Sequence, residues 1–159
     1  MDPEQRHEFM RHAVRLSAER MRDGEGGPFG AVIVKDGRLV AEGWSRVTSA
    51  NDPTAHAEIT AIRRACAALG TFSLAGCEIF TSCEPCPMCL AAIYWARLER
   101  ITFANSRGDA AAIGFDDERI YGEVSKAIDD RAIPTTRLAL PDAQAAFAEW
   151  SAKADKTPY

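Results

Sequence analysis

Two short fragments, well separated in the sequence, constrain the fold of this chain more than any other feature. His56–Glu58 reads His-Ala-Glu, and Pro85–Cys89 reads Pro-Cys-Pro-Met-Cys. Each fragment opens a predicted helix, and imidazole and thiol groups of this kind are common metal ligands. Cys86 and Cys89 are three residues apart, so their sulfurs project from one side of the first helical turn and can share an ion. If the imidazole and the two thiolates bind one ion, the N-termini of the two predicted helices must lie next to each other.

One histidine and two cysteines form a ligand set typical of zinc. The N-terminus of a helix carries partial positive charge, which lowers the pKa of a thiol and favours the thiolate. Three protein ligands leave one of the four positions of zinc open, which is the layout of a catalytic site and not of a closed structural site. Glu58 follows the histidine by two residues, and at the start of a helix both side chains can reach the same ion. Its carboxylate is therefore a candidate for moving protons beside the metal.

Other interpretations of the cysteines stay open at this point. Cys83, Cys86 and Cys89 begin a ferredoxin-like C-x2-C-x2-C run, but the position of its next cysteine holds Ile93. A closed structural zinc site would use Cys83 as a fourth ligand. A redox Cys-x-x-Cys pair would leave the His-Ala-Glu fragment without a role.

Hydrophobic periodicity predicts an α/β layered domain. The apolar residues of 3–22 recur at helical spacing, and Asp36-Gly37 is a hairpin turn between strands 30–35 and 39–44. Further along, the pattern predicts helices over 55–69, 87–96 and 141–150, strands over 77–81, 100–104 and 135–140, and a loop over 45–53. Strand–helix alternation after an opening hairpin favours a mixed sheet, here of five strands. A length of 159 residues fits a single domain spanning residues 1–159.

The composition excludes several classes of protein. The formal net charge is −4 and no basic stripe is visible, so a nucleic-acid partner is not expected. No apolar run approaches the roughly 18 residues of a membrane span, and residues 1–6 do not open a signal peptide. The five cysteines are an odd number, which, without an export signal, favours a reducing cytoplasmic compartment. The sequence therefore favours a small substrate that carries little charge.

The two fragments resemble a known signature. Residues 56–58 and 85–89 fit the H-x-E…P-C-x-x-C pattern of the zinc-dependent nucleobase deaminases at every position. Within that superfamily, the chain most resembles the bacterial guanine deaminases of the cytidine deaminase-like fold. The similarity runs nearly end to end and includes Gly27–Val34, Asn51–Glu58, Thr81–Cys89, Ala92–Arg97, Gly114–Asp117 and the terminal Tyr159.

The resemblance implies a fold and a reaction. The fold is a three-layer α/β/α sandwich with a mixed five-stranded sheet. His56, Cys86 and Cys89 are implied as the ligands of one zinc ion per subunit, and Glu58 as the proton shuttle. The implied reaction is hydrolytic deamination of guanine at C2, which gives xanthine and ammonia in purine catabolism or salvage.

The resemblance also implies a set of substrate-binding residues. Phe29 would pack on the base, and Asp117 would accept hydrogen bonds from the purine edge, while Trp95 and Tyr159 would complete the site. Ser45 stands where the family usually has an asparagine, whose amide contacts the substrate carbonyl and a ring nitrogen. Each residue also has a structural interpretation: core for Phe29, core or dimer interface for Trp95, a helix cap for Asp117 and a frayed terminus for Tyr159.

Members of the family are domain-swapped dimers, so the resemblance implies a homodimer. The C-terminal segment, about 141–159, would be exchanged and act as a lid, and Trp95 would reach across from the partner. The implied ligand is a small nucleobase, with no nucleic acid and no membrane. The same chemistry on guanosine, cytosine or adenosine in a transfer RNA remains an alternative, as does a non-catalytic zinc-stabilised interaction domain.

Overall fold

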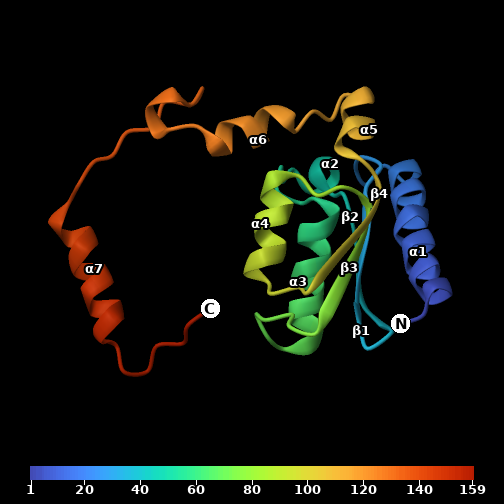
Figure 1. Cartoon of the computed structure of the whole chain (residues 1–159), viewed down its shortest axis with the longest axis horizontal. Coiled ribbons are helices and arrows are strands. Elements are labelled where there is room, and N and C mark those ends of the chain that lie inside the picture. The colour runs from blue at the N-terminus through green and yellow to red at the C-terminus, as the bar shows by residue number, and fades with distance from the viewer.

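A four-stranded sheet lies at the centre of the computed structural model, which describes residues 1–159 (Figure 1). The strands are β1 (Gly30–Lys35), β2 (Arg38–Trp44), β3 (Cys77–Cys83) and β4 (Arg100–Asn105). Their order is β2-β1-β3-β4. Strand β1 is antiparallel to both β2 and β3, whereas β3 and β4 are parallel. The predicted mixed sheet is confirmed, with four strands instead of five.

The predicted fifth strand over Thr135–Leu140 is wrong. This segment has no secondary structure, and all of its residues are exposed. A strand must pair its backbone groups with a neighbour, and the chain has left the core before it reaches this segment (Figure 1). Its β-branched and apolar residues therefore lack the packing partners on which strand propensity depends.

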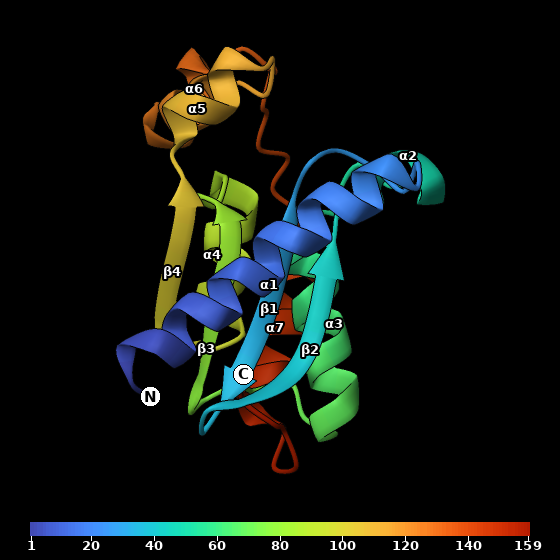
Figure 2. The same cartoon turned by 90° about the vertical axis from the view of Figure 1, so that its right-hand side faces the viewer.

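Some helices cover the two faces of the sheet, and others lie outside these layers. The helices are α1 (Pro3–Arg22), α2 (Val47–Ala50), α3 (Ala57–Leu69), α4 (Pro87–Trp95), α5 (Arg107–Ala112), α6 (Glu118–Ser125) and α7 (Pro141–Ala152), with a 3-10 turn, η1 (Ile128–Asp130). Helix α1 lies on one face, and α3 and α4 lie on the other (Figures 1 and 2). The predicted three layers are confirmed. The one-turn helix α2 lies inside the predicted loop 45–53 and is too short for periodicity to reveal.

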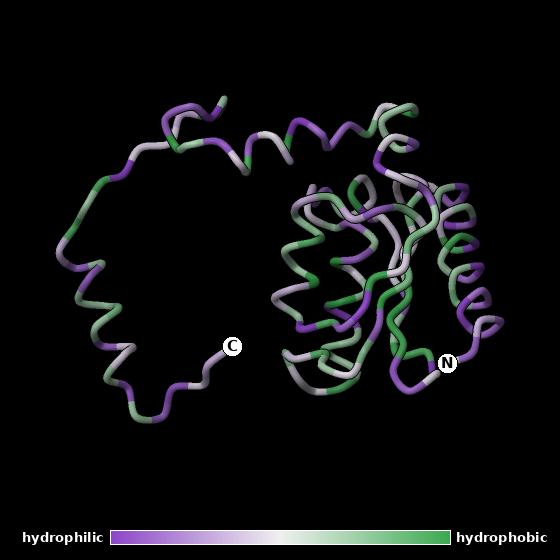
Figure 3. Tube along the Cα trace, viewed as in Figure 1, coloured by the Kyte–Doolittle hydropathy of each residue, from purple (hydrophilic) through white to green (hydrophobic).

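The two faces of β1 build two separate cores. Val32 and Val34 point to one face, where they pack with Phe80 of β3 against Ala13 and Leu16 of α1. The alternate residues point to the opposite face and pack against α3 and α4, in a cluster that includes Ala31, Ile33, Ile79, Ala57, Ala61 and Ile93. Figure 3 shows the hydrophobic residues concentrated along the central strands. Burial on both faces explains why β1 reads as a continuous apolar run.

A glycine lets α3 lie directly on the sheet. A Cβ atom at Gly43 of β2 would lie 2.1 Å from the carbonyl oxygen of Ala57 and 2.5 Å from the backbone nitrogen of Ala61. Any side chain at this position would push the first turn of α3 away from β2. This close contact therefore holds the first turn of α3, which follows His56, against β2.

The C-terminal part of the chain forms an arm outside this core. Every residue from Ala132 to Tyr159 is exposed, and α7 lies apart from the layered core (Figure 1). Large apolar side chains are exposed along the arm: Ile133, Leu138, Leu140, Phe147 and Trp150. No helix combines the length and the apolar character needed to cross a membrane.

Candidate metal centre and active site

Three candidate ligands meet where two helices begin. His56 is the N-cap residue of α3 and Cys86 is the N-cap residue of α4, while Cys89 lies in the first turn of α4. The Nδ1 atom of His56 lies 3.6 Å from Sγ of Cys86 and 3.5 Å from Sγ of Cys89. The ligand atoms of all three residues lie within 4.8 Å of one another. The predicted convergence of the two fragments is confirmed.

These separations fit zinc. Zinc–sulfur and zinc–nitrogen bonds of about 2.3 Å and 2.0–2.1 Å at tetrahedral angles put the nitrogen roughly 3.5 Å from each sulfur. Cys83, the fourth ligand of the alternative structural site, is not in the group. Its Sγ donates instead to the carbonyl oxygen of Ser106 at 3.7 Å. The protein therefore supplies three of the four ligands that zinc usually takes.

The thiols of the cluster and Cys83 differ in acidity. A hydrogen bond from the Cys89 thiol, together with one from His56, lowers the pKa of Cys86 to about 4 although the residue is partly buried. The hydrogen bond with Cys86 raises the pKa of His56. At Cys83, burial raises the pKa to about 11. Cys86 is thus prepared as a thiolate ligand, whereas Cys83 is a neutral buried thiol.

The carboxyl group of Glu58 lies beside the cluster. Glu58 is in the first turn of α3, is only 6% exposed and accepts a hydrogen bond from Oγ1 of Thr81 at 3.3 Å. Burial raises the pKa of Glu58, and this effect exceeds the opposite effect of hydrogen bonds from its own backbone N–H and from the Cys89 thiol. The start of α3 therefore brings both His56 and Glu58 to the same point, as the sequence predicts. The sequence gives no indication that Thr81 is the hydrogen-bond partner of this carboxyl group, apart from its position in a buried strand.

Two further predicted residues lie where β1 and β2 meet the loops. Ser45 directly follows β2, is 5% exposed, and donates its backbone N–H to the carbonyl oxygen of Phe29 at 3.0 Å. A Cβ atom at Gly26 would lie 2.6 Å from Oγ of Ser45. The half-buried ring of Phe29 meets the edge of Phe115 at a centroid distance of 4.9 Å. Phe115 is missing from the predicted site because nothing local distinguishes it from a loop aromatic.

Asp117 directly precedes helix α6. It occupies the N-cap position of that helix, but its side chain makes no capping hydrogen bond, so the alternative role as a side-chain cap is not observed. Burial raises the pKa of Asp117, and the charge of Cys86 raises it further.

The structure does not bring Trp95 and Tyr159 to this cluster. Trp95 ends α4, and the nine residues of this helix put it about 13 Å along the axis from Cys86. Trp95 is 64% exposed and Tyr159 is 74% exposed. Their rings lie 6.2 Å apart, beside Phe72 and around a pocket of about 290 Å³. The two residues thus pair with each other at the far end of α4.

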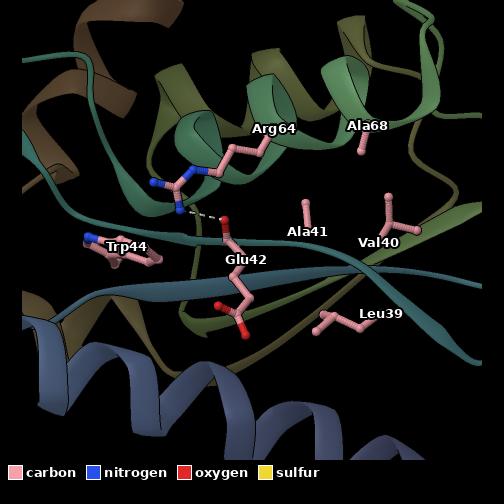
Figure 4. A pocket seen from close by; sticks show the side chains of 7 residues that line it. All are labelled: Leu39, Val40, Ala41, Glu42, Trp44, Arg64 and Ala68. Carbon is pink, nitrogen blue, oxygen red and sulfur yellow. Dashed lines mark hydrogen bonds between the residues drawn. The ribbon is translucent and has the colours of Figure 1, made fainter.

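A second depression lies between β2 and α3 (Figure 4). Its volume is about 410 Å³, and it contains none of the candidate ligands. Arg64 crosses it, donating to the carbonyl oxygen of Glu42 at 3.1 Å and stacking over Trp44 at 4.1 Å. These contacts hold the edge strand to the helix, so the depression belongs to the packing of β2 and not to the metal centre.

The geometry predicts different metal contents for two cysteine variants. Cys86→Ser should lose zinc, because one of three ligands is removed. Cys83→Ser, the matched control, should keep one zinc ion per chain, because its thiol lies outside the group. Elemental analysis of the purified proteins measures the ratio directly. Loss of zinc from Cys83→Ser would contradict the three-ligand assignment and favour the closed four-ligand site.

Comparisons with known proteins agree with this geometry. A family model for the cytidine and deoxycytidylate deaminase zinc-binding region matches residues 3–105. The chain is 52% identical to guanine deaminase of Bacillus subtilis (strain 168) over 151 residues, which are 95% of this chain and 97% of that protein. The X-ray structure of guanine deaminase from Bacillus subtilis superposes with a TM-score of 0.94 at 50% identity, covering 100% of this chain and 99% of the other. The tRNA-specific adenosine deaminase of Aquifex aeolicus (strain VF5) is 41% identical over 96 residues, which are 60% of this chain and 63% of that protein. The chain therefore belongs to the cytidine and deoxycytidylate deaminase zinc-binding family.

Proposed function

We propose that this protein hydrolyses guanine to xanthine and ammonia. The observation that carries the proposal is the open three-ligand group of His56, Cys86 and Cys89 with the buried carboxyl of Glu58 beside it. The preference for guanine is supported by the similarity to guanine deaminase over nearly the whole of both chains. The negative net charge speaks against the transfer-RNA alternative, because RNA binding requires a basic channel.

Each residue of the cluster has a place in the proposed reaction. Zinc, when bound by the histidine and the two cysteines, makes a water molecule acidic enough to act as a nucleophile near neutral pH. Glu58 accepts one proton from the water and delivers it to a ring nitrogen of guanine, and it then carries the second proton of the water to the departing amine. Thr81 donates to Oε1 of Glu58 at 3.3 Å and so holds the carboxyl group in place. One water is consumed and one ammonia is released for each guanine.

The base is held by residues from three segments. Phe29, supported by the edge of Phe115, packs against the flat face of the purine. Asp117 accepts hydrogen bonds from the N–H groups of the purine edge. Ser45 contacts the opposite part of the base with a hydroxyl group, which is shorter than an asparagine amide and can bridge through a water molecule.

The functional unit of our proposal is a homodimer with exchanged arms. In each chain, residues 1–159 form one domain, and the segment 141–159 caps the site of the other copy. The exposed apolar residues of the arm support this assignment, because such surfaces are usually covered by a partner. The full-length superposition on a crystal structure supports the extended placement of the arm, since a misplaced arm would lower the TM-score. Trp95 and Tyr159, which lie together at the far end of α4, would then complete the site of the partner.

Ammonia release tests the proposed function. The zinc-loaded protein should release ammonia from guanine and not from guanosine, cytosine or adenine. Glu58→Gln should lower kcat by about 10²- to 10⁴-fold, because it removes the proton carrier, and should retain zinc. Glu8→Gln on the exposed face of α1 is the matched control and should keep full activity. Release from another member of the panel would reassign the substrate, and silence towards all four with zinc bound would favour the non-catalytic interaction domain.

A substitution at Ser45 tests the substrate-binding assignment. Ser45→Asn restores an amide that can donate and accept at once, so it should raise kcat/KM for guanine by roughly 5- to 150-fold, equivalent to about 1–3 kcal/mol. Ser49→Asn, at an exposed position of the one-turn helix α2 that follows, is the matched control and should leave kcat/KM unchanged. An unchanged kcat/KM in Ser45→Asn would remove Ser45 from the proposed base-binding set.

Mixed dimers test whether Trp95 acts across the interface. Glu58→Gln and Trp95→Ala are each expected to be impaired alone. Co-expression should restore about a quarter of the wild-type activity per subunit, because half of randomly paired dimers contain one site with both residues intact. Co-expression of Glu58→Gln with Cys86→Ser, two changes in one cluster, should restore none. Absence of recovery in the first pair would place Trp95 in its own subunit or outside the site.

A further inference from the structure

One hydrogen bond ties helix α6 to the loop that carries the metal ligands. The hydroxyl group of Tyr121 donates to the carbonyl oxygen of Pro85 at 2.7 Å, across 36 residues of sequence. Pro85 directly precedes Cys86, so this bond ends one residue from a ligand. Tyr121 is partly buried in a helix whose other residues are largely exposed.

Arg107 reinforces the same attachment. Its guanidinium lies over the ring of Tyr121 at 4.3 Å. Its backbone N–H donates to Oε2 of Glu84 at 2.9 Å, and its side chain lies 3.6 Å from the carboxylate of Glu118. The first residue of α5 therefore contacts both the loop that follows β3 and the first turn of α6, and it holds the two together.

Asp117 lies between two points of attachment. The backbone N–H of Tyr121 donates to the carbonyl oxygen of Asp117 at 3.1 Å, so the two residues are one helical turn apart and share a face of α6. On the other side of Asp117, Phe115 packs edge-on against Phe29 at 4.9 Å. Because the side chain of Asp117 makes no capping bond, its direction depends on how these two contacts seat the segment.

We propose that Tyr121 is a positioning residue, whose bond to Pro85 seats α6 so that Asp117 faces the metal centre. The proposal rests on the proposed function in one respect, the contact between Asp117 and the substrate. The same bond attaches the largely exposed helix α6 to the loop before α4 of its own chain, whereas every residue from Ala132 onwards is exposed. Tyr121 is thus one of the contacts that seat Asp117, and the exposed arm begins beyond it.

Removal of a single hydroxyl group isolates this role. Tyr121→Phe keeps the ring and its contact with Arg107 but leaves the carbonyl oxygen of Pro85 without its donor. A hydrogen bond of this kind corresponds to roughly a 5- to 10-fold change in an equilibrium. We expect kcat/KM for guanine to fall by that factor, mainly through KM, because binding of the base depends on Asp117. Tyr94→Phe, at an exposed position of α4, is the matched control and should leave kcat/KM unchanged.

A double-mutant cycle distinguishes positioning from a general loss of structure. In the background of Asp117→Asn, where the carboxylate is already absent, Tyr121→Phe should change kcat/KM by less than about 2-fold. An equal loss in both backgrounds would show that Tyr121 acts independently of Asp117 and would overturn the proposal. The zinc content of Tyr121→Phe should stay at one ion per chain.

Hydrogen exchange gives a readout that does not depend on turnover. In the zinc-loaded protein, amide exchange across 113–125 should be faster in Tyr121→Phe than in the wild type, while exchange in α1 should be unchanged. Unchanged exchange across 113–125 would overturn the proposal even if activity fell. If the wild type releases no ammonia from guanine, the proposed function fails, and exchange still decides whether Tyr121 seats this segment.

Discussion

The meeting of two helix N-termini is the constraint on which the rest of this structure depends. His56 caps α3 and Cys86 caps α4, so the metal ligands converge only if both helices start at the same edge of the sheet. The parallel pairing of β3 and β4 places the connecting helix α4 across one face, as such a crossover requires. The close approach permitted by Gly43 then brings the first turn of α3 to the same place.

The same arrangement shifts the pKa values of two neighbouring acidic groups in opposite directions. Hydrogen bonds lower the pKa of Cys86 to about 4, while burial raises the pKa of the neighbouring Glu58. A thiolate suited to binding a cation therefore lies beside a carboxyl group that can hold a proton. Divergent acidities of this kind are typical of sites that perform acid–base chemistry.

The chain consists of a packed core and an exposed C-terminal arm. Residues up to α6 build the sheet, the helical layers and the ligand group, and Tyr121 and Arg107 fasten α6 to the loop before Cys86. Beyond this point the arm exposes large apolar side chains such as Phe147 and Leu138. An isolated chain gains nothing from such exposure, and in the dimer that we propose a second copy covers these side chains.

The sequence by itself determined the layers, the approximate bounds of the central helices and strands, and the two fragments that supply the ligands, because hydrophobic period and residue spacing are local properties. The tertiary structure decided the features that depend on contacts between residues far apart in the sequence. Cys83 and Cys86 are indistinguishable by spacing, yet only the fold turns Cys83 towards Ser106. Thr135–Leu140 has the composition of a strand but reaches no edge with which to pair. Trp95 ends α4 and therefore lies about 13 Å along the helix axis from Cys86, away from the ligand group of its own chain. A local pattern assigns a residue to a helix, but only the packing of that helix decides which distant side chains each of its ends meets.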